Sequence, residues 1–248
     1  MRWLTLTTRL DIEYDGSDFR GWAAQPGLRT VQGELEAALS TILPEKVDLS
    51  VAGRTDAGVH ALGQVASFDS EADPPANLAR RLNGMLPHDI AVIAAAATPD
   101  GFDARRDARS RTYCYRVLAR PAPNPFERGR SLWWPRPLDR DALRACAEML
   151  HGSHDFTAFT PTDTDHVHFQ RKVMRAEWIE DGDAVMAFWV EADGFMHNMV
   201  RALVGTMLEV GGGQRTPDGL ARLLGGAPRE QAGDTAPAHG LYLASVRY

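Results

Sequence analysis

The sequence contains only two cysteines among its 248 residues, Cys114 and Cys146. They do not form a Cys-x-x-Cys pair, so the sequence indicates neither a disulfide framework nor a cysteine-based zinc site. No apolar run approaches the roughly 20 residues that cross a bilayer. Residues 1–8 are also too short and too polar for a secretory signal. We therefore expect a cytoplasmic protein with no membrane segment.

Lysine is almost absent as well, because Lys46 and Lys172 are the only two, and arginine supplies the other positive charges. The net charge of −6 is unevenly distributed along the chain. Residues 102–130 contain three acidic residues against eight arginines: Arg105, Arg106, Arg109, Arg111, Arg116, Arg120, Arg128 and Arg130. Such a basic stripe on an acidic protein fits a confined phosphate-binding surface, although a solvated strand face with a charge run would have the same composition.

Hydrophobic periodicity predicts two similar halves. In the first half we expect a strand (9–14), a helix capped by Thr30 (31–42) and two strands (49–52 and 64–68). A helix that begins at a proline (75–82) and a last strand (90–93) follow. The second half repeats this order over 112–118, 139–150, 172–179, 185–191, 195–210 and 241–246, with a short extra helix from Thr216. The order β-α-β-β-α-β is ferredoxin-like. We therefore expect an α+β protein with two such domains, residues 1–107 and 108–248.

The segment from Gly53 to Phe68 connects two expected strands through a turn, in which Gly53, Gly58 and Gly63 can take backbone angles that other residues avoid. Arg54 and Asp56 lie two positions apart in it and carry opposite charges. A nearby positive charge lowers the pKa of an acid, so Arg54 can keep a carboxylate ionised and oriented. Aspartate beside glycine is also ordinary turn chemistry, because it caps backbone amides. From the residues alone, Asp56 is either a turn residue or a catalytic carboxylate.

Residues 53–61, Gly-Arg-Thr-Asp-Ala-Gly-Val-His-Ala, are followed by Gly-Gln-Val and Phe-Asp, and this pattern resembles the signature of TruA-type tRNA pseudouridine synthases. Other segments resemble the same family in order along nearly the whole chain: Tyr14-Asp15-Gly16, Phe19-x-Gly21-Trp22, Thr30-Val31-Gln32, Arg111-Thr112-Tyr113, His154-Asp155-Phe156 and Met199-Val200-Arg201. Two positions depart from the family pattern. Ala23 stands where glutamine is usual, and Asp103 where histidine is usual, which places an acid beside the basic stripe.

The resemblance implies two ferredoxin-like domains whose sheets join around a central RNA-binding cleft. It also implies a homodimer that converts uridine to pseudouridine at positions 38, 39 or 40 of the tRNA anticodon arm, by base flipping and without cofactor or metal. The reaction detaches uracil from ribose at N1 and reattaches it through C5. The reaction needs one well-placed carboxylate, and the position of Asp56 in the motif identifies it as that group. It could attack C1′, attack C6 or remove the 2′ proton, and the sequence does not separate these routes.

Five further residues are candidates for the site. By the same resemblance, Arg54 would hold or replace the flipped base, whose extraction costs a few kcal/mol, and Arg201 would pair with the catalytic aspartate. Tyr113 would stack on the extruded uracil, and we expect Arg105 and Arg111 of the basic stripe to bind substrate. The residues alone also fit a simpler interpretation, in which Tyr113 is an ordinary aromatic residue of a strand and Arg201 is a solvent-facing helix residue.

Two other functions fit parts of the sequence. Tandem βαββαβ domains also describe RRM-type RNA-binding modules, although residues 65–68 and 112–115 only partly resemble the aromatic strands of those modules. A metal-dependent hydrolase would use a set of histidines and aspartates that fall in expected loops without typical ligand spacing: His151, His154, Asp155, Asp163, Asp165, His166 and His168. We expect no metal site, and a packing or hydrogen-bonding role for His60.

Overall fold

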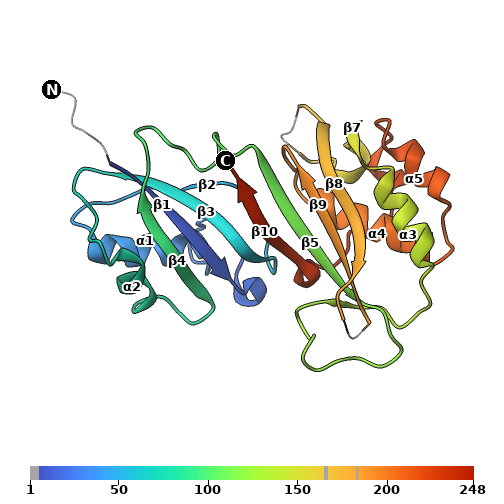
Figure 1. Cartoon of the computed structure of the whole chain (residues 1–248), viewed down its shortest axis with the longest axis horizontal. Coiled ribbons are helices and arrows are strands. Elements are labelled where there is room, and N and C mark those ends of the chain that lie inside the picture. Colours follow the sequence, from blue (N-terminus) through green and yellow to red (C-terminus); the bar gives the residue numbers. More distant parts are fainter. Residues whose placement is uncertain (1–5, 165–166, 183) are drawn as a thin grey trace. The chain divides into compact units, whose positions relative to one another are not determined.

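The computed structural model describes residues 6–164, 167–182 and 184–248 (Figure 1). The protein is mixed α+β, with strands that pair mostly antiparallel. It divides into two compact units: unit 1 comprises Met1–Arg109 and Leu243–Tyr248, and unit 2 comprises Ser110–Tyr242. Among the described helices, none is both long and apolar enough to cross a membrane.

Unit 1 contains a β-sheet with α1 and α2 beside it (Figure 1). Its elements are β1 (Leu6–Tyr14), α1 (Val31–Ile42), β2 (Ser50–Val51), β3 (His60–Ser70), α2 (Leu78–Asn83), β4 (Ile90–Ala97) and most of β10 (Leu241–Arg247), with the 3₁₀ turn η1 at Gly16–Asp18. The strand order is β4-β1-β3, with β2 and β10 both beside β3. The pairs β1–β3, β1–β4 and β2–β3 are antiparallel.

Helix α1 confirms a prediction made from local sequence. The side chain of Thr30 accepts a hydrogen bond from the amide of Gly33 and so caps the helix start. Val31, Leu35 and Leu39 recur at helical spacing and are buried. Burying each leucine side chain contributes about 1.5–3 kcal/mol, so this apolar face fixes α1 in unit 1.

Two predicted helices begin later than the sequence suggests. Helix α2 begins at Leu78 because Pro75 starts a turn, in which its carbonyl accepts from the Leu78 amide. Helix α4 (Met199–Gly211) was expected from Phe195. Asn198 precedes it with φ = +60°, a left-handed conformation that does not continue a right-handed helix. Phe195 therefore lies outside the helix.

Unit 2 has the strand order β5-β9-β8-β7, and neighbouring strands in this order are antiparallel. Its elements are β5 (Ser110–Leu118), β6 (Leu132–Trp133), α3 (Arg140–Glu148), β7 (Gly152–Asp155), β8 (Gln170–Glu180), β9 (Val185–Ala192), α4 and α5 (Pro217–Leu223), with 3₁₀ turns η2 (Thr157–Phe159), η3 (Arg229–Gln231) and η4 (Ala238–Gly240). Helix α3 packs against α4 and β8 (Figure 1). The prediction of a loop around His154 is wrong, because Gly152–Asp155 forms β7 and pairs with β8.

Candidate active site

The loop between β2 and β3 carries Arg54 and Asp56. The ladder between the two strands reaches the pair Ala52 N–Val65 O (2.9 Å), after which the chain leaves the sheet. Arg54 is exposed and Asp56 is half-buried. A hydrogen bond from Val59 N to Asp56 O (3.1 Å) closes the turn before β3 begins at His60. Both charged side chains thus project from one short loop.

The main chain that follows β1 lies directly against this loop. The amide of Trp22 donates to Thr55 O (3.0 Å), and the amide of Gly58 donates to Phe19 O (3.3 Å). A Cβ atom on Gly16 would lie 1.9 Å from Val59 O, and one on Gly21 would lie 2.9 Å from Thr55 O. Only glycine permits so close an approach of two backbones, so residues 16–22 hold the loop from one side.

A buried hydrogen-bond network holds the loop from β1 and β3. Gln64 Nε2 donates to Gly53 O (2.8 Å) and to Tyr14 Oη (3.2 Å), and Tyr14 Oη lies 2.7 Å from Thr55 Oγ1. Burial raises the pKa of Tyr14 to about 12, although the hydrogen bonds with Thr55 and Gln64 act to lower it. The tyrosine hydroxyl is therefore neutral at physiological pH. Sequence reasoning missed this network; its signal is Gln64, an uncharged polar residue at the start of a predicted strand and in the Gly-Gln-Val of the signature.

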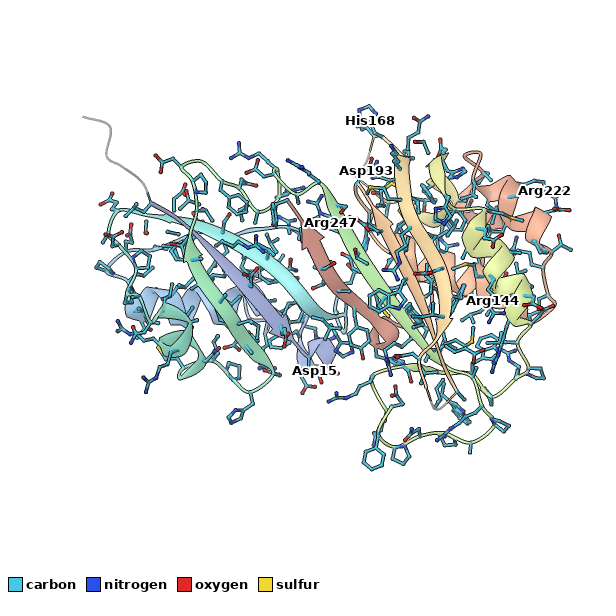
Figure 2. All side chains as sticks on the ribbon, in the orientation of Figure 1. Asp15, Arg144, His168, Asp193, Arg222 and Arg247 are labelled. Carbon is cyan, nitrogen blue, oxygen red and sulfur yellow. The ribbon has the colours of Figure 1, made fainter. Side chains whose placement is uncertain are left out.

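His60 has the structural role expected from the sequence. It is 3 % exposed, and its Nδ1 atom accepts a hydrogen bond from the amide of Gly16 (3.0 Å). Asp15, labelled in Figure 2, stands beside it at the end of β1 and caps η1 by accepting from the amide of Ser17. The 3₁₀ turn η1 is thus held by Asp15 at the end of β1 and by His60 at the start of β3.

The glycines of the signature have different roles. Gly58 has φ = +78° and supplies the expected turn. Gly63, expected in the turn, lies instead in β3, where a Cβ atom would be 2.5 Å from the carbonyl oxygen of Ala244. Gly63 therefore permits the close approach of β10 to β3, a contact between residues far apart in sequence.

Arg105 lies in unit 1 on the turn that follows Phe102, and its side chain is exposed. Its amide and that of Arg106 donate to Asp103 Oδ1 (2.9 and 2.7 Å), and the hydroxyl of Ser50 donates to Asp103 Oδ2 (3.0 Å). Burial pushes the pKa of Asp103 up, but these hydrogen bonds and the charge of Arg106 outweigh it and leave the pKa below its usual value. Asp103 thus shapes the turn that presents Arg105.

The other candidates belong to unit 2. Arg111 and Tyr113 lie two positions apart on β5 and so line the same face of that strand. Tyr113 is buried, and its ring packs edge-on against Phe195 with centroids 4.9 Å apart. Arg111 Nη1 donates to the carbonyl oxygen of Asp193 (3.2 Å), at the end of β9, and Figure 2 labels Asp193. Arg111 and Tyr113 thus share one face of β5, and Arg54 and Asp56 share one loop of unit 1.

Arg201 lies on the first turn of α4 and is half-buried. Its Nε atom donates to Ala236 O (2.7 Å), and its Nη1 atom donates to Asn198 Oδ1 (2.6 Å). These bonds fix the guanidinium within unit 2. The alternative of a solvent-facing arginine therefore does not describe this residue.

Within the described ranges, no group of three or more His, Cys, Asp or Glu side chains is placed to hold a metal ion. His154 Nε2 lies 2.9 Å from the carbonyl oxygen of His151, and Asp155 Oδ1 accepts from the amide and hydroxyl of Thr157. Asp165 and His166, two members of the proposed ligand set, lie outside the described residues.

Comparison with known proteins gives matches over both units. A family model described as tRNA pseudouridine synthase matches residues 12–106 and 146–248. A tRNA pseudouridine synthase A from Frankia casuarinae is 49 % identical to this chain over 244 residues, 97 % of this chain and 88 % of the relative. Its counterpart from Streptomyces griseus is 45 % identical (97 % and 87 % covered), and that from Thermus thermophilus is 44 % identical (95 % and 94 % covered).

These matches define the class of protein as pseudouridine synthases, isomerases that convert uridine to pseudouridine in RNA. The substrate RNA of this chain is tRNA. The chain belongs to the tRNA pseudouridine synthase A family, as its resemblance around Asp56 indicated.

Proposed function

We propose that this isomerase acts on uridines at positions 38, 39 and/or 40 of the tRNA anticodon arm, with Asp56 as its catalytic carboxylate. The observation that carries this proposal is the way in which the loop that carries Arg54 and Asp56 is held. This loop is held by main-chain contacts and buried hydrogen bonds, while the Asp56 carboxylate itself stays half-exposed. A fixed main chain with an accessible charged group is what a preorganised catalytic site requires.

The reaction breaks the N1–C1′ bond of uridine and forms a C5–C1′ bond, while N1 gains a proton and C5 loses one. In our proposal the flipped base enters the site, and Arg54 holds it or occupies the space that it leaves in the arm. Tyr113 stacks on the uracil ring, and Arg201 pairs with the Asp56 carboxylate. Arg105 and Arg111 bind the RNA backbone, because arginine forms charge-assisted hydrogen bonds with phosphate. No cofactor takes part in this scheme.

We also propose a larger arrangement that follows from the family resemblance. Units 1 and 2 would be the two ferredoxin-like domains expected over residues 1–107 and 108–248, and RNA would bind in a cleft to which both contribute. This accounts for candidate residues in both units. A homodimer in the cytoplasm belongs to the same proposal, and light scattering at micromolar concentration tests the dimer: a monomeric mass would contradict it.

The decisive experiment measures tritium release from tRNA labelled at uridine C5, because C5 loses its hydrogen when it becomes the glycosidic carbon. We expect release by the wild type and none above background by Asp56→Asn, with tRNA binding retained in a filter assay. Asp48→Asn is the matched control, since the Asp48 side chain is 90 % exposed elsewhere in unit 1. Substantial turnover by Asp56→Asn would refute the assignment of Asp56.

The same assay tests the remaining roles. Arg201→Ala should slow release at saturating tRNA, and Arg201→Lys should recover little of it, because lysine lacks the second donor that the guanidinium uses. Mapping pseudouridine in the product by primer extension after carbodiimide treatment identifies the modified positions. Modification confined to sites outside the anticodon arm would contradict the proposed specificity.

A further inference from the structure

The carbonyl group of Gly53 lies where the main chain leaves the β2–β3 ladder. The backbone pair Ala52 N–Val65 O (2.9 Å) belongs to that ladder. One residue further, Gly53 O accepts from the side chain of Gln64 at 2.8 Å. Gly53 is half-buried, and its carbonyl, which has left the ladder, needs another hydrogen-bond partner. The Gln64 carboxamide therefore takes the place of a neighbouring strand at the first residue of the loop.

The nitrogen of the same carboxamide makes a second hydrogen bond, and its oxygen is also engaged. Gln64 Nε2 donates to Tyr14 Oη (3.2 Å), and Gln64 Oε1 accepts from the amide of Val65 (3.2 Å). Tyr14 Oη in turn lies within hydrogen-bond distance of Thr55 Oγ1, at 2.7 Å. Gln64 thus reaches the loop twice, directly at Gly53 and through Tyr14 at Thr55.

These two anchor points flank Arg54, and the second immediately precedes Asp56. Gln64, Tyr14 and Thr55 are 0, 5 and 6 % exposed. A buried polar group that loses its partner costs about 1–3 kcal/mol, so the network resists displacement of the loop. Because the Tyr14 hydroxyl is neutral at physiological pH, its function in this network is to bridge two side chains.

The geometry points to Gln64 as a positioning residue for the isomerisation: its carboxamide fixes, at Gly53 and by way of Tyr14 at Thr55, the segment from which Arg54 and Asp56 project. The inference deepens the proposed function and rests on it, because Gln64 acts through the loop that carries the Asp56 carboxylate. Gln64 is wholly buried and presents no surface to RNA. It therefore governs the rate of reaction on bound tRNA and leaves tRNA affinity unchanged.

The test compares single-turnover rates with tRNA dissociation constants for four variants. Gln64→Met removes the amide at similar length, and Thr55→Val removes only the hydroxyl. We expect both to lower the rate about 10- to 100-fold with affinity within about twofold of wild type. Thr55→Ser retains the hydroxyl and should stay within about threefold of the wild-type rate. Thr98→Val is the matched control, because the Thr98 hydroxyl bonds to Thr7 O at the opposite end of β1.

The outcomes separate this inference from the proposed function. A wild-type rate in folded Gln64→Met would overturn the inference while leaving Asp56 in its role. Should Gln64→Met fail to fold, the Thr55 pair decides: equal rates for Thr55→Val and Thr55→Ser overturn the inference. A parallel loss of rate and affinity would do the same, because it marks a general structural defect. Full activity of Asp56→Asn would overturn the proposed function, and this inference with it.

Discussion

Replacing Gly16 by alanine should slow the reaction by displacing the candidate loop. The added Cβ atom would lie 1.9 Å from Val59 O, whereas observed Cβ contacts are at least 3.0 Å. One of the two backbones must therefore move by about 1 Å. Val59 follows the turn that begins at Asp56, so the shift reaches the carboxylate. Misplacement of about 1 Å costs roughly 100-fold in rate, or about 2.7 kcal/mol of transition-state stabilisation.

The assay is single-turnover tritium release, with the tRNA dissociation constant and the melting temperature measured on the same preparations. Gly84→Ala is the control, because Gly84 has an ordinary φ of −77° and its added Cβ would have no contact shorter than 3.4 Å. A folded Gly16→Ala protein that releases tritium within about twofold of the wild-type rate would refute the argument. It would mean that the loop tolerates a shift of this size.

Three further predictions concern stability and accessibility. The folded-state pKa of Tyr14 is about 12, so the stability that the neutral hydroxyl contributes is complete below about pH 10 and is lost as the pH rises towards 12. Urea unfolding at these two pH values should show a fall in the free energy of unfolding that is up to about 3 kcal/mol larger in wild type than in Tyr14→Phe. Cys114 and Cys146 are buried, and burial raises the pKa of their thiols to about 12 and 11; a disulfide-exchange reagent should label neither at neutral pH until the chain is denatured. Asp103→Ala should destabilise the protein by about 1–2 kcal/mol in urea, since three donors lose their acceptor; unchanged stability would show that water replaces the carboxylate.

Local sequence patterns predicted the elements whose stability is local. Helix α1 combines an N-cap at Thr30 with an apolar face of helical period, and both signals lie within a dozen residues. The predicted start of α4 was wrong because the signal that ends the helical path does not lie in the apolar pattern. Phe195 and Met196 continue the apolar pattern, but the left-handed conformation of Asn198 ends the helical path. A periodicity argument contains no information about the backbone angle of one asparagine.

In the candidate loop, too, local features were predictable from the sequence and long-range contacts were not. The presence of Arg54 and Asp56 on one turn follows from their spacing and from Gly58. The contacts that hold the turn involve residues from 14 to 64, and no pattern of adjacent residues encodes them. Gly63 is the clearest case: its lack of a side chain matters because β10, almost 180 residues later, passes within van der Waals distance. Such requirements become visible only when distant strands are placed side by side.

Asp103 departs from the family pattern and places an acid beside the basic stripe. The structure gives this acid a role in holding the main chain. In the structure the carboxylate accepts hydrogen bonds from the amides of Arg105 and Arg106 and from Ser50, and its side chain is 21 % exposed. Its lowered pKa keeps it ionised at neutral pH, where it stabilises the turn. Asp103 therefore holds the turn through the main chain, and the side chain of Arg105 is exposed beside it.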